Sequence, residues 1–212
     1  LLESLAMKGD VAAQKKLGVI YWWSQRDVDK ELSLYWTKKA AQKGDPEAQN
    51  NYGTFFYNGE LVNKDLDRAF DWYQMSANQG NALAMQNLGS FYLLINKDIN
   101  NAIKFLKMAF DKGEISAAWS LGYLYMNGLN GNEVDENLTY EWMLKAAQAN
   151  YKPAQYEVSQ MLLEGKGVKL NNKTSFNWLL KASGKQGDRN DKWEALIRRD
   201  LAFRYFYGVG TE

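Results

Sequence analysis

The sequence predicts an all-α fold, an α-solenoid of stacked antiparallel helix pairs, on three observations. Small residues recur about every 35 residues along the 212-residue chain, and a second small residue follows each of them nine positions later. Large apolar residues recur at helical spacing around these second positions. Only 2 prolines interrupt the chain, so little of it is obliged to be loop. The paired small positions are Gly9 and Gly18, Gly44 and Gly53, Gly80 and Gly89, Gly113 and Gly122, and Asn150 and Ser159.

The first helix of each pair is predicted from an apolar stripe that surrounds a glycine. In the second unit Ala48, Tyr52 and Phe56 follow helical spacing, with Gly53 between them. Glycine is a poor helix former, so its recurrence indicates a point where two helices cross and a side chain would not fit. The matching small residues on the second helix are Ser33, Ala69 and Ala102.

The second helix of each pair is predicted to begin at an acidic or amide cap and to end at a glycine. Asp and Asn accept from the free amides of a first turn, and the negative charge suits the positive end of the helix. Gly44, Gly80 and Gly113 suit left-handed C-terminal turns, and Pro46 and Pro153 suit helix starts. The predicted caps are Asp29, Asp65, Asp98, Asp135 and Asn171.

One pair cannot bury its own apolar face, so neighbouring pairs must stack. We therefore expect residues 1–212 to form a single array whose two ends each fall inside a unit, and hence a longer native protein. Ile95–Asp98 is a shortened loop in the third unit, and Trp193–Tyr207 is predicted to be a long helix. The expected units are 10–44, 45–80, 81–113, 114–150, 151–187 and a partial 188–212.

Composition excludes several classes of function. A formal net charge of +1 gives no electrostatic case for binding nucleic acid, and no apolar run is long enough to cross a membrane. The chain has no Cys and no His, which removes thiolate and imidazole chemistry and their metal sites. We therefore expect no cofactor and no metal. The carboxylate pairs Asp65 with Asp67 and Asp188 with Asp191 remain, but a cap and solvated loop charges explain them better.

The repeated columns resemble Sel1-like repeats, a subclass of the tetratricopeptide-type helical repeats. That resemblance implies a TPR-like superhelix. The third unit departs from the pattern, with Ile95 at the position of the loop glycine and Met108 at that of the lysine. The matching positions are Tyr52, Gly53, Phe56, Gly59, Val62, Asp65, Ala69, Trp72, Ala77 and Gly80; Leu121, Gly122, Tyr125, Gly128, Asp135, Trp142, Lys145, Ala146 and Ala147; and Gly165, Gly167, Val168, Trp178, Lys181 and Ala182.

The resemblance also implies a function. Such proteins assemble complexes in bacterial signalling, envelope biogenesis, host interaction or toxin immunity, and in eukaryotic protein quality control. We therefore expect a non-enzymatic scaffold or adaptor, in a bacterial setting and in either the periplasm or envelope or the cytoplasm, that binds another protein or a peptide segment. An immunity protein that neutralises a secreted toxin is one alternative. An enzyme acting on glycans or peptidoglycan through a carboxylate pair is another.

If the first helices line a concave face, the partner-binding residues lie off the packing columns, on a stripe rich in aromatic and amide side chains. Tyr and Trp bury much area and keep a polar group, which suits interface hot spots. The alternative is that these side chains fill space between units or lie under the sixth helix. Trp119 and Tyr123 are the main candidates, and the full predicted set is Lys15, Trp22, Thr54, Tyr57, Gln86, Ser90, Trp119, Tyr123, Tyr156 and Gln160.

Overall fold

The computed structural model describes residues 1–24, 26–128, 134–184 and 192–211. Within these residues the chain is helical, with one π-helical turn and no strand. The elements are α1 (Leu2–Met7), α2 (Val11–Trp22), α3 (Asp27–Gln42), α4 (Pro46–Asn58), α5 (Leu66–Asn78), α6 (Ala82–Phe91), η1 (Tyr92–Asn96), α7 (Ile99–Asp111), α8 (Ile115–Met126), α9 (Glu136–Gln148), α10 (Lys152–Glu164), α11 (Asn172–Ser183) and α12 (Lys192–Tyr207).

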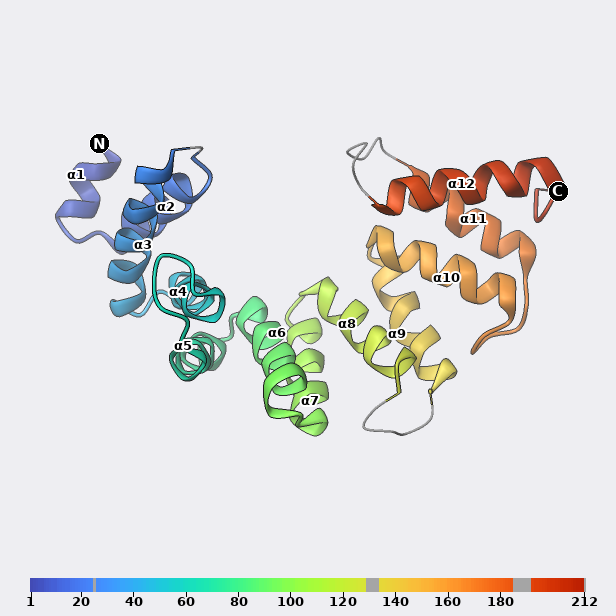
Figure 1. Ribbon diagram of the computed structural model, residues 1–212, viewed down its shortest axis with the longest axis horizontal. Helices are drawn as coiled ribbons and strands as arrows, with labels where there is room; N and C mark the ends of the chain where they lie inside the picture. Colours follow the sequence, from blue (N-terminus) through green and yellow to red (C-terminus); the bar gives the residue numbers. More distant parts are fainter. Residues whose placement is uncertain (25, 129–133, 185–191, 212) are drawn as a thin grey trace. The chain divides into compact units, whose positions relative to one another are not determined.

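The helices form hairpins that pack on one another within two compact units, Leu1–Glu114 and Ile115–Glu212 (Figure 1). In the first unit α2 packs on α3, α4 on α5 and α6 on α7, while α3 contacts α4 and α5 contacts α6. In the second unit α8 packs on α9 and α10 on α11, while α9 contacts α10 and α12 contacts both α10 and α11. The predicted all-α stack of antiparallel helix pairs is confirmed.

The helix crossings lie at the predicted small residues. Ser33 Oγ donates to the carbonyl oxygen of Gly18 at 2.7 Å, which joins α3 to α2. A Cβ added at Gly53 would lie 3.2 Å from the carbonyl oxygen of Ala69. In the fifth pair Ser159 replaces the glycine, and its hydroxyl donates to the carbonyl oxygen of Ser175 at 2.8 Å. The small residues therefore recur because the backbones of paired helices approach closely.

Four of the five predicted caps are confirmed. Asp65, Asp98, Asp135 and Asn171 each accept from a backbone N–H three residues later, at 2.9 to 3.1 Å. The prediction for Asp29 is wrong, because α3 already begins at Asp27. Its buried carboxylate instead accepts from the Ser24 hydroxyl and from Arg26 Nε.

Glycine turns end the second helices as predicted. Gly44, Gly80 and Gly113 have φ values of +91°, +88° and +93°, and Asn150 takes the same role at +64°. Pro46 begins α4 and Pro153 lies in the first turn of α10. The first helices also have caps, which were not predicted from the sequence. These are Asp10, Asp45 and Asn81, which accept from the amides of Ala13, Ala48 and Ala84.

The two irregular regions have different outcomes. The shortened loop of the third pair contains the π-helical turn η1, followed by Lys97 at φ +56°. The long sixth helix is confirmed as α12. The expected unit boundary at 187/188 and the carboxylates of Asp188 and Asp191 lie outside the described residues.

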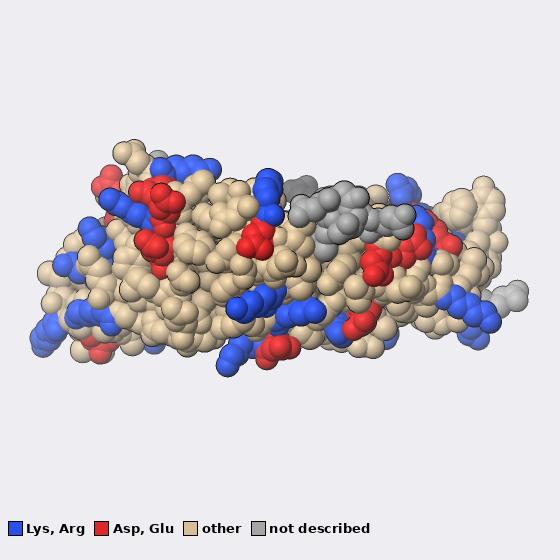
Figure 2. Space-filling view, turned by 90° about the horizontal axis from the view of Figure 1, so that it is seen from below, with Lys and Arg blue, Asp and Glu red and all other residues tan. Residues whose placement is uncertain are grey.

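The surface carries both signs of charge. On the face drawn in Figure 2, basic and acidic side chains are scattered among uncharged residues. Over the part of the chain that the structure describes, no helix combines the length and the apolar character that crossing a membrane requires.

Candidate partner-binding surfaces

The first unit contains a groove of about 410 Å³ built from α2, α3, α4 and α6. Its rim carries exposed apolar side chains, with Trp23 78% exposed. Trp22 stands deeper, with its ring edge-on to Phe55 at 5.4 Å. The lining residues are Gly18, Val19, Trp22, Trp23, Ser33, Thr37, Asn50, Asn51, Thr54, Phe55, Glu60, Leu83 and Asn87. We call this the first-unit groove.

The floor of the first-unit groove is polar. Asn87 Nδ2 donates to Oδ1 of the buried Asn50 at 2.8 Å, and Asn50 Nδ2 donates to Asn51 Oδ1 at 3.3 Å. Thr54 Oγ1 lies 3.2 Å from the Tyr73 hydroxyl. Among the described residues nothing bonds to Asn87 Oδ1 or to Asn51 Nδ2. One acceptor and one donor are thus available to a ligand such as a peptide backbone.

Two predicted residues, Trp22 and Thr54, line this groove, and four others of the first unit do not. Tyr57 is half-buried and packs near the rings of Tyr73 and Phe91, at centroid distances of 6.5 and 6.4 Å. Gln86 and Ser90 are half-buried on α6, whose groove-lining residues are Leu83 and Asn87 instead.

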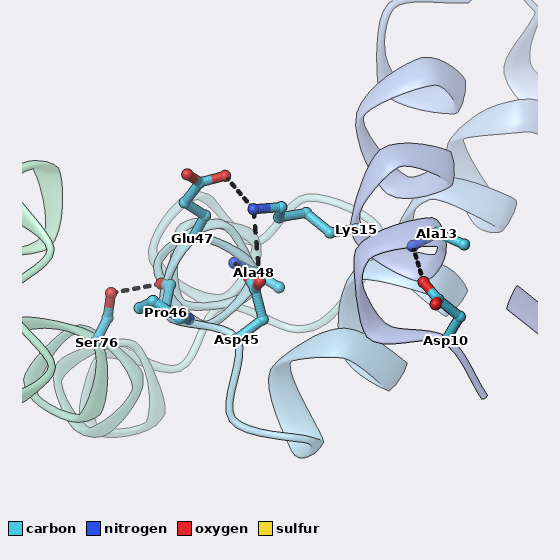
Figure 3. A network of polar contacts seen from close by, with 8 residues as sticks. All are labelled: Asp10, Ala13, Lys15, Asp45, Pro46, Glu47, Ala48 and Ser76. Carbon is cyan, nitrogen blue, oxygen red and sulfur yellow. Dashed lines mark hydrogen bonds and ion pairs between the residues drawn. The ribbon is translucent and has the colours of Figure 1, made fainter.

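Lys15, the fourth, bridges two helices of the first unit (Figure 3). Its ammonium lies 2.8 Å from Glu47 Oε2 and 3.5 Å from Asp45 Oδ2, at the N-terminus of α4. The hydrogen bond to Glu47 raises the pKa of Lys15 above its usual value. Asp45 also caps α4 through the amide of Ala48. Lys15 therefore links α2 to α4 and keeps its charge.

The second unit contains a pocket of about 370 Å³ between α8, α10 and α12. Trp119 is half-buried, and its ring lies 5.8 Å from Tyr151 and 5.8 Å from Trp193, edge-on to the latter. Tyr123 is 51% exposed at the pocket mouth. The lining residues are Trp119, Tyr123, Met126, Tyr151, Pro153, Glu157 and Trp193. We call this the aromatic pocket.

The aromatic pocket holds one carboxyl group, that of Glu157 on α10. Burial raises the pKa of Glu157, and the charge of Glu164 raises it further, while Lys166 acts in the opposite direction. Lys166 and Glu164 pair with each other at 2.6 Å. Within the described part of the chain, Glu157 makes no ion pair and no side-chain hydrogen bond.

The predicted pair Trp119 and Tyr123 thus comes together in one pocket, whereas Tyr156 and Gln160 are engaged by α12. Tyr156 is 8% exposed, and its hydroxyl donates to Asp200 Oδ2 at 2.9 Å. Gln160 Nε2 donates to the same oxygen at 2.8 Å. Burial and the hydrogen bond to Asp200 raise the pKa of Tyr156 to about 12. These two side chains hold the last helix in place.

The set predicted from the sequence lacks Tyr151, Pro153, Glu157 and Trp193 of the aromatic pocket. They lie outside the single helical stripe from which the site was predicted. A tryptophan in the long sixth helix and an aromatic residue beside Pro153 were visible signals. Trp193 comes beside Trp119 through the packing of α12 against α10, whereas Tyr151, at the start of α10, meets the ring of Trp119 without α12.

The described residues were also searched for catalytic carboxylates and metal sites. The Asp65 carboxylate caps α5 and pairs with Arg68 Nε at 3.2 Å, so it is used in the fold. No group of three or more His, Cys, Asp or Glu residues suited to a metal ion occurs in the described ranges.

Comparison with known proteins agrees with the repeated helix pairs of the fold. A family model described as "Sel1 repeat" matches residues 11–45, 46–81, 82–114, 115–151 and 152–185. The chain is 26% identical to a protective antigen present in uropathogenic Escherichia coli strains that displays an SLR fold. The superposition has a TM-score of 0.79 and covers 100% of this chain and 44% of that one.

Two curated relatives are much longer than this chain. An ERAD-associated E3 ubiquitin-protein ligase component, HRD3B of Arabidopsis thaliana, is 31% identical over 96 residues, 44% of this chain and 15% of its own length. The chitin synthase regulator SKT5 of Saccharomyces cerevisiae is 25% identical over 182 residues, 84% of this chain and 22% of its own length. This chain therefore spans less than a quarter of the length of either relative.

Proposed function

Because this chain belongs to the Sel1 repeat family, we propose that it is a protein-interaction scaffold that binds a partner protein through the aromatic pocket and the first-unit groove. Members of the family generally serve as scaffolds for interactions between proteins. The matched segments of the two curated relatives lie in a ligase component and in a synthase regulator, names that describe work alongside an enzyme.

The observation that carries the proposal is the aromatic pocket. Trp119 and Tyr123 keep accessible ring surface beside Trp193 and Met126, in a hollow of about 370 Å³. Large aromatic side chains in a partly enclosed hollow are the commonest energetic centres of protein interfaces, because they exclude water over a wide area at low entropic cost.

The first-unit groove supports the same role with different chemistry. Its apolar rim offers contact area, and its amide floor offers a donor and an acceptor. An extended peptide presents both backbone groups and side chains, so it could use rim and floor together.

We do not extend the proposal to catalysis. A family of regulators and adaptors gives no support for it, and in the described candidate pair of Asp65 and Asp67 the first carboxylate is held as the cap of α5.

The test is capture of a partner from the native source with the immobilised chain, followed by affinity measurement for wild type and for a Trp119→Ala, Tyr123→Ala double variant. We expect the double variant to lose about 2 kcal/mol or more of binding free energy, as hot-spot residues do. Circular dichroism should remain helical. Tyr35→Ala, at a 47% exposed ring outside both surfaces, is the matched control and should bind normally.

Unchanged affinity of the double variant would refute the assignment of the aromatic pocket. If the captured partner is an enzyme and a tight 1:1 complex abolishes its activity, the scaffold would be an inhibitor of the immunity type. Retained partner activity in the complex would indicate an adaptor.

A further inference from the structure

The aromatic pocket combines ring surfaces with one unpaired carboxyl group. We propose that it receives the guanidinium of an arginine side chain that projects from the partner protein, with Glu157 as the counter-charge. This inference rests on the proposed function and names the chemistry that the partner must present.

Four aromatic rings line the pocket beside this carboxyl group, those of Trp119, Tyr123, Tyr151 and Trp193. The ring centroid of Trp119 lies 5.8 Å from that of Tyr151 and 5.8 Å from that of Trp193. The ring planes meet at 48° with Tyr151 and at 88° with Trp193. Tyr123 adds a ring that is 51% exposed at the mouth. The faces of Trp and Tyr rings carry negative charge density, so a cation within about 6 Å of a ring centre is attracted to them.

The carboxyl group of Glu157 supplies the second recognition element. The basic side chain that acts on this carboxyl group, Lys166, is already paired with Glu164 at 2.6 Å. Among the described residues Glu157 has no ion-pair or hydrogen-bond partner, and Lys166 acts on it only through its charge, so the carboxylate oxygens are available to a ligand.

Because the carboxylate of Glu157 is partly buried, a bound cation would stabilise its charged form. Desolvation raises the pKa of Glu157, which means that the fold disfavours its charged form. A cation that enters the pocket restores part of the lost solvation, and a charge-assisted hydrogen bond is stronger in a site that excludes water.

The geometry favours arginine over lysine. A guanidinium is flat, stacks on aromatic faces and presents parallel N–H donors to a carboxylate. An ammonium is a compact and strongly hydrated charge, which a hollow with one carboxyl group and several rings would desolvate without offering three acceptors.

The test uses the whole chain and three short probes, Ac-Gly-Arg-Gly-NH₂, its lysine analogue and its citrulline analogue. Citrulline has the shape of arginine without the charge. Binding is followed by the NMR signals of the Trp119 and Trp193 indole N–H groups, assigned with single Trp→Phe variants. We expect the arginine probe to bind about tenfold more tightly than the citrulline probe, the ratio that one charge-assisted contact gives.

Glu157→Gln should abolish the preference for arginine over citrulline, because the amide keeps the shape and loses the charge. Glu141→Gln, which removes a second-unit carboxylate that pairs with Lys145 and does not line the pocket, should keep that preference. Equal binding of the arginine and citrulline probes to wild type would overturn the inference. So would a preference that survives in Glu157→Gln, or tighter binding of the lysine probe.

The outcomes separate this inference from the proposed function. A partner that depends on Trp119 and Tyr123, found together with no arginine preference, would overturn the arginine pocket and leave the scaffold role standing. An arginine preference without any partner that depends on these residues would do the reverse.

Discussion

Gly89→Ala tests whether the repeated glycines exist because helices cross there. A Cβ at residue 89 would lie 2.7 Å from Leu106 Cγ, 2.9 Å from Leu106 Cδ2 and 3.3 Å from the carbonyl oxygen of Ala102. Leu106 is 1% exposed and cannot move aside into solvent. Alanine is favoured over glycine in a helix by about 1 kcal/mol, whereas overpacking a core costs about 1–3 kcal/mol. Crowding should prevail, with a net loss of about 1 kcal/mol.

A double-mutant cycle isolates the crowding. Leu106→Ala alone should cost about 2–5 kcal/mol through the cavity that it leaves. In that background the new methyl group at residue 89 enters vacated space, so Gly89→Ala should become neutral or stabilising. The coupling free energy between the two sites should reach about 1–2 kcal/mol.

Urea unfolding followed by circular dichroism and tryptophan fluorescence measures these differences. Both probes are needed because repeat arrays can unfold in steps. Ser90→Ala, one residue along the same helix, is the control and should change the free energy of unfolding little. If Gly89→Ala is as stable as wild type, or if the two changes are additive, close approach does not explain the glycine.

Three further predictions concern polar groups. Asp45→Asn keeps a cap for α4 and removes only the ion pair with Lys15, so it should lower the free energy of unfolding by less than about 1 kcal/mol. Asp45→Ala also removes the cap and should cost about 1 kcal/mol more, as measured by urea unfolding. Folding raises the pKa of Glu157, so the free energy of unfolding of wild type should match that of Glu157→Gln below about pH 4. As the pH rises through the ordinary glutamate pKa and then the raised pKa of the folded state, wild type should lose stability relative to the variant. Equal urea midpoints from about pH 4 to about pH 8 would contradict this. Arg204 is 2% exposed and its Nη2 atom has no partner in the described structure, so Arg204→Met should leave the melting temperature unchanged or raise it. A clear drop in the melting temperature would show that the hydrogen bond from Arg204 Nη1 to Ser175 outweighs the cost of burying the guanidinium.

The helix pairing could be predicted from the sequence because it depends on local, repeated requirements. Gly53 and Ala69 mark a close approach that admits no larger side chain, and Asp65 marks a helix start. These constraints recur in each unit, so many columns report the same geometry. Asp29 was mispredicted because α3 already begins at Asp27, whereas the second helix of the next unit begins at Leu66, one residue after the aligned cap Asp65.

The candidate site was only partly predictable. The stripe correctly placed Trp119 and Tyr123 on one face of one helix, because that relation is local. Trp193 reaches Trp119 only through the packing of α12 on α10, which no periodic column encodes. Glu157 was not predicted, because a single glutamate on a helix forms no distinctive sequence pattern and only the folded pocket places aromatic rings around it.

The origin of the aromatic pocket limits how it can be transplanted. Trp119, Glu157 and Trp193 come from three successive helical pairs, so no single repeat carries the complete site. Grafting one 35-residue module into another array would move at most a fragment of it. An engineer who wishes to transfer the pocket must carry over the contiguous block from α8 to α12, because the loss of one module inside that block would separate its lining residues.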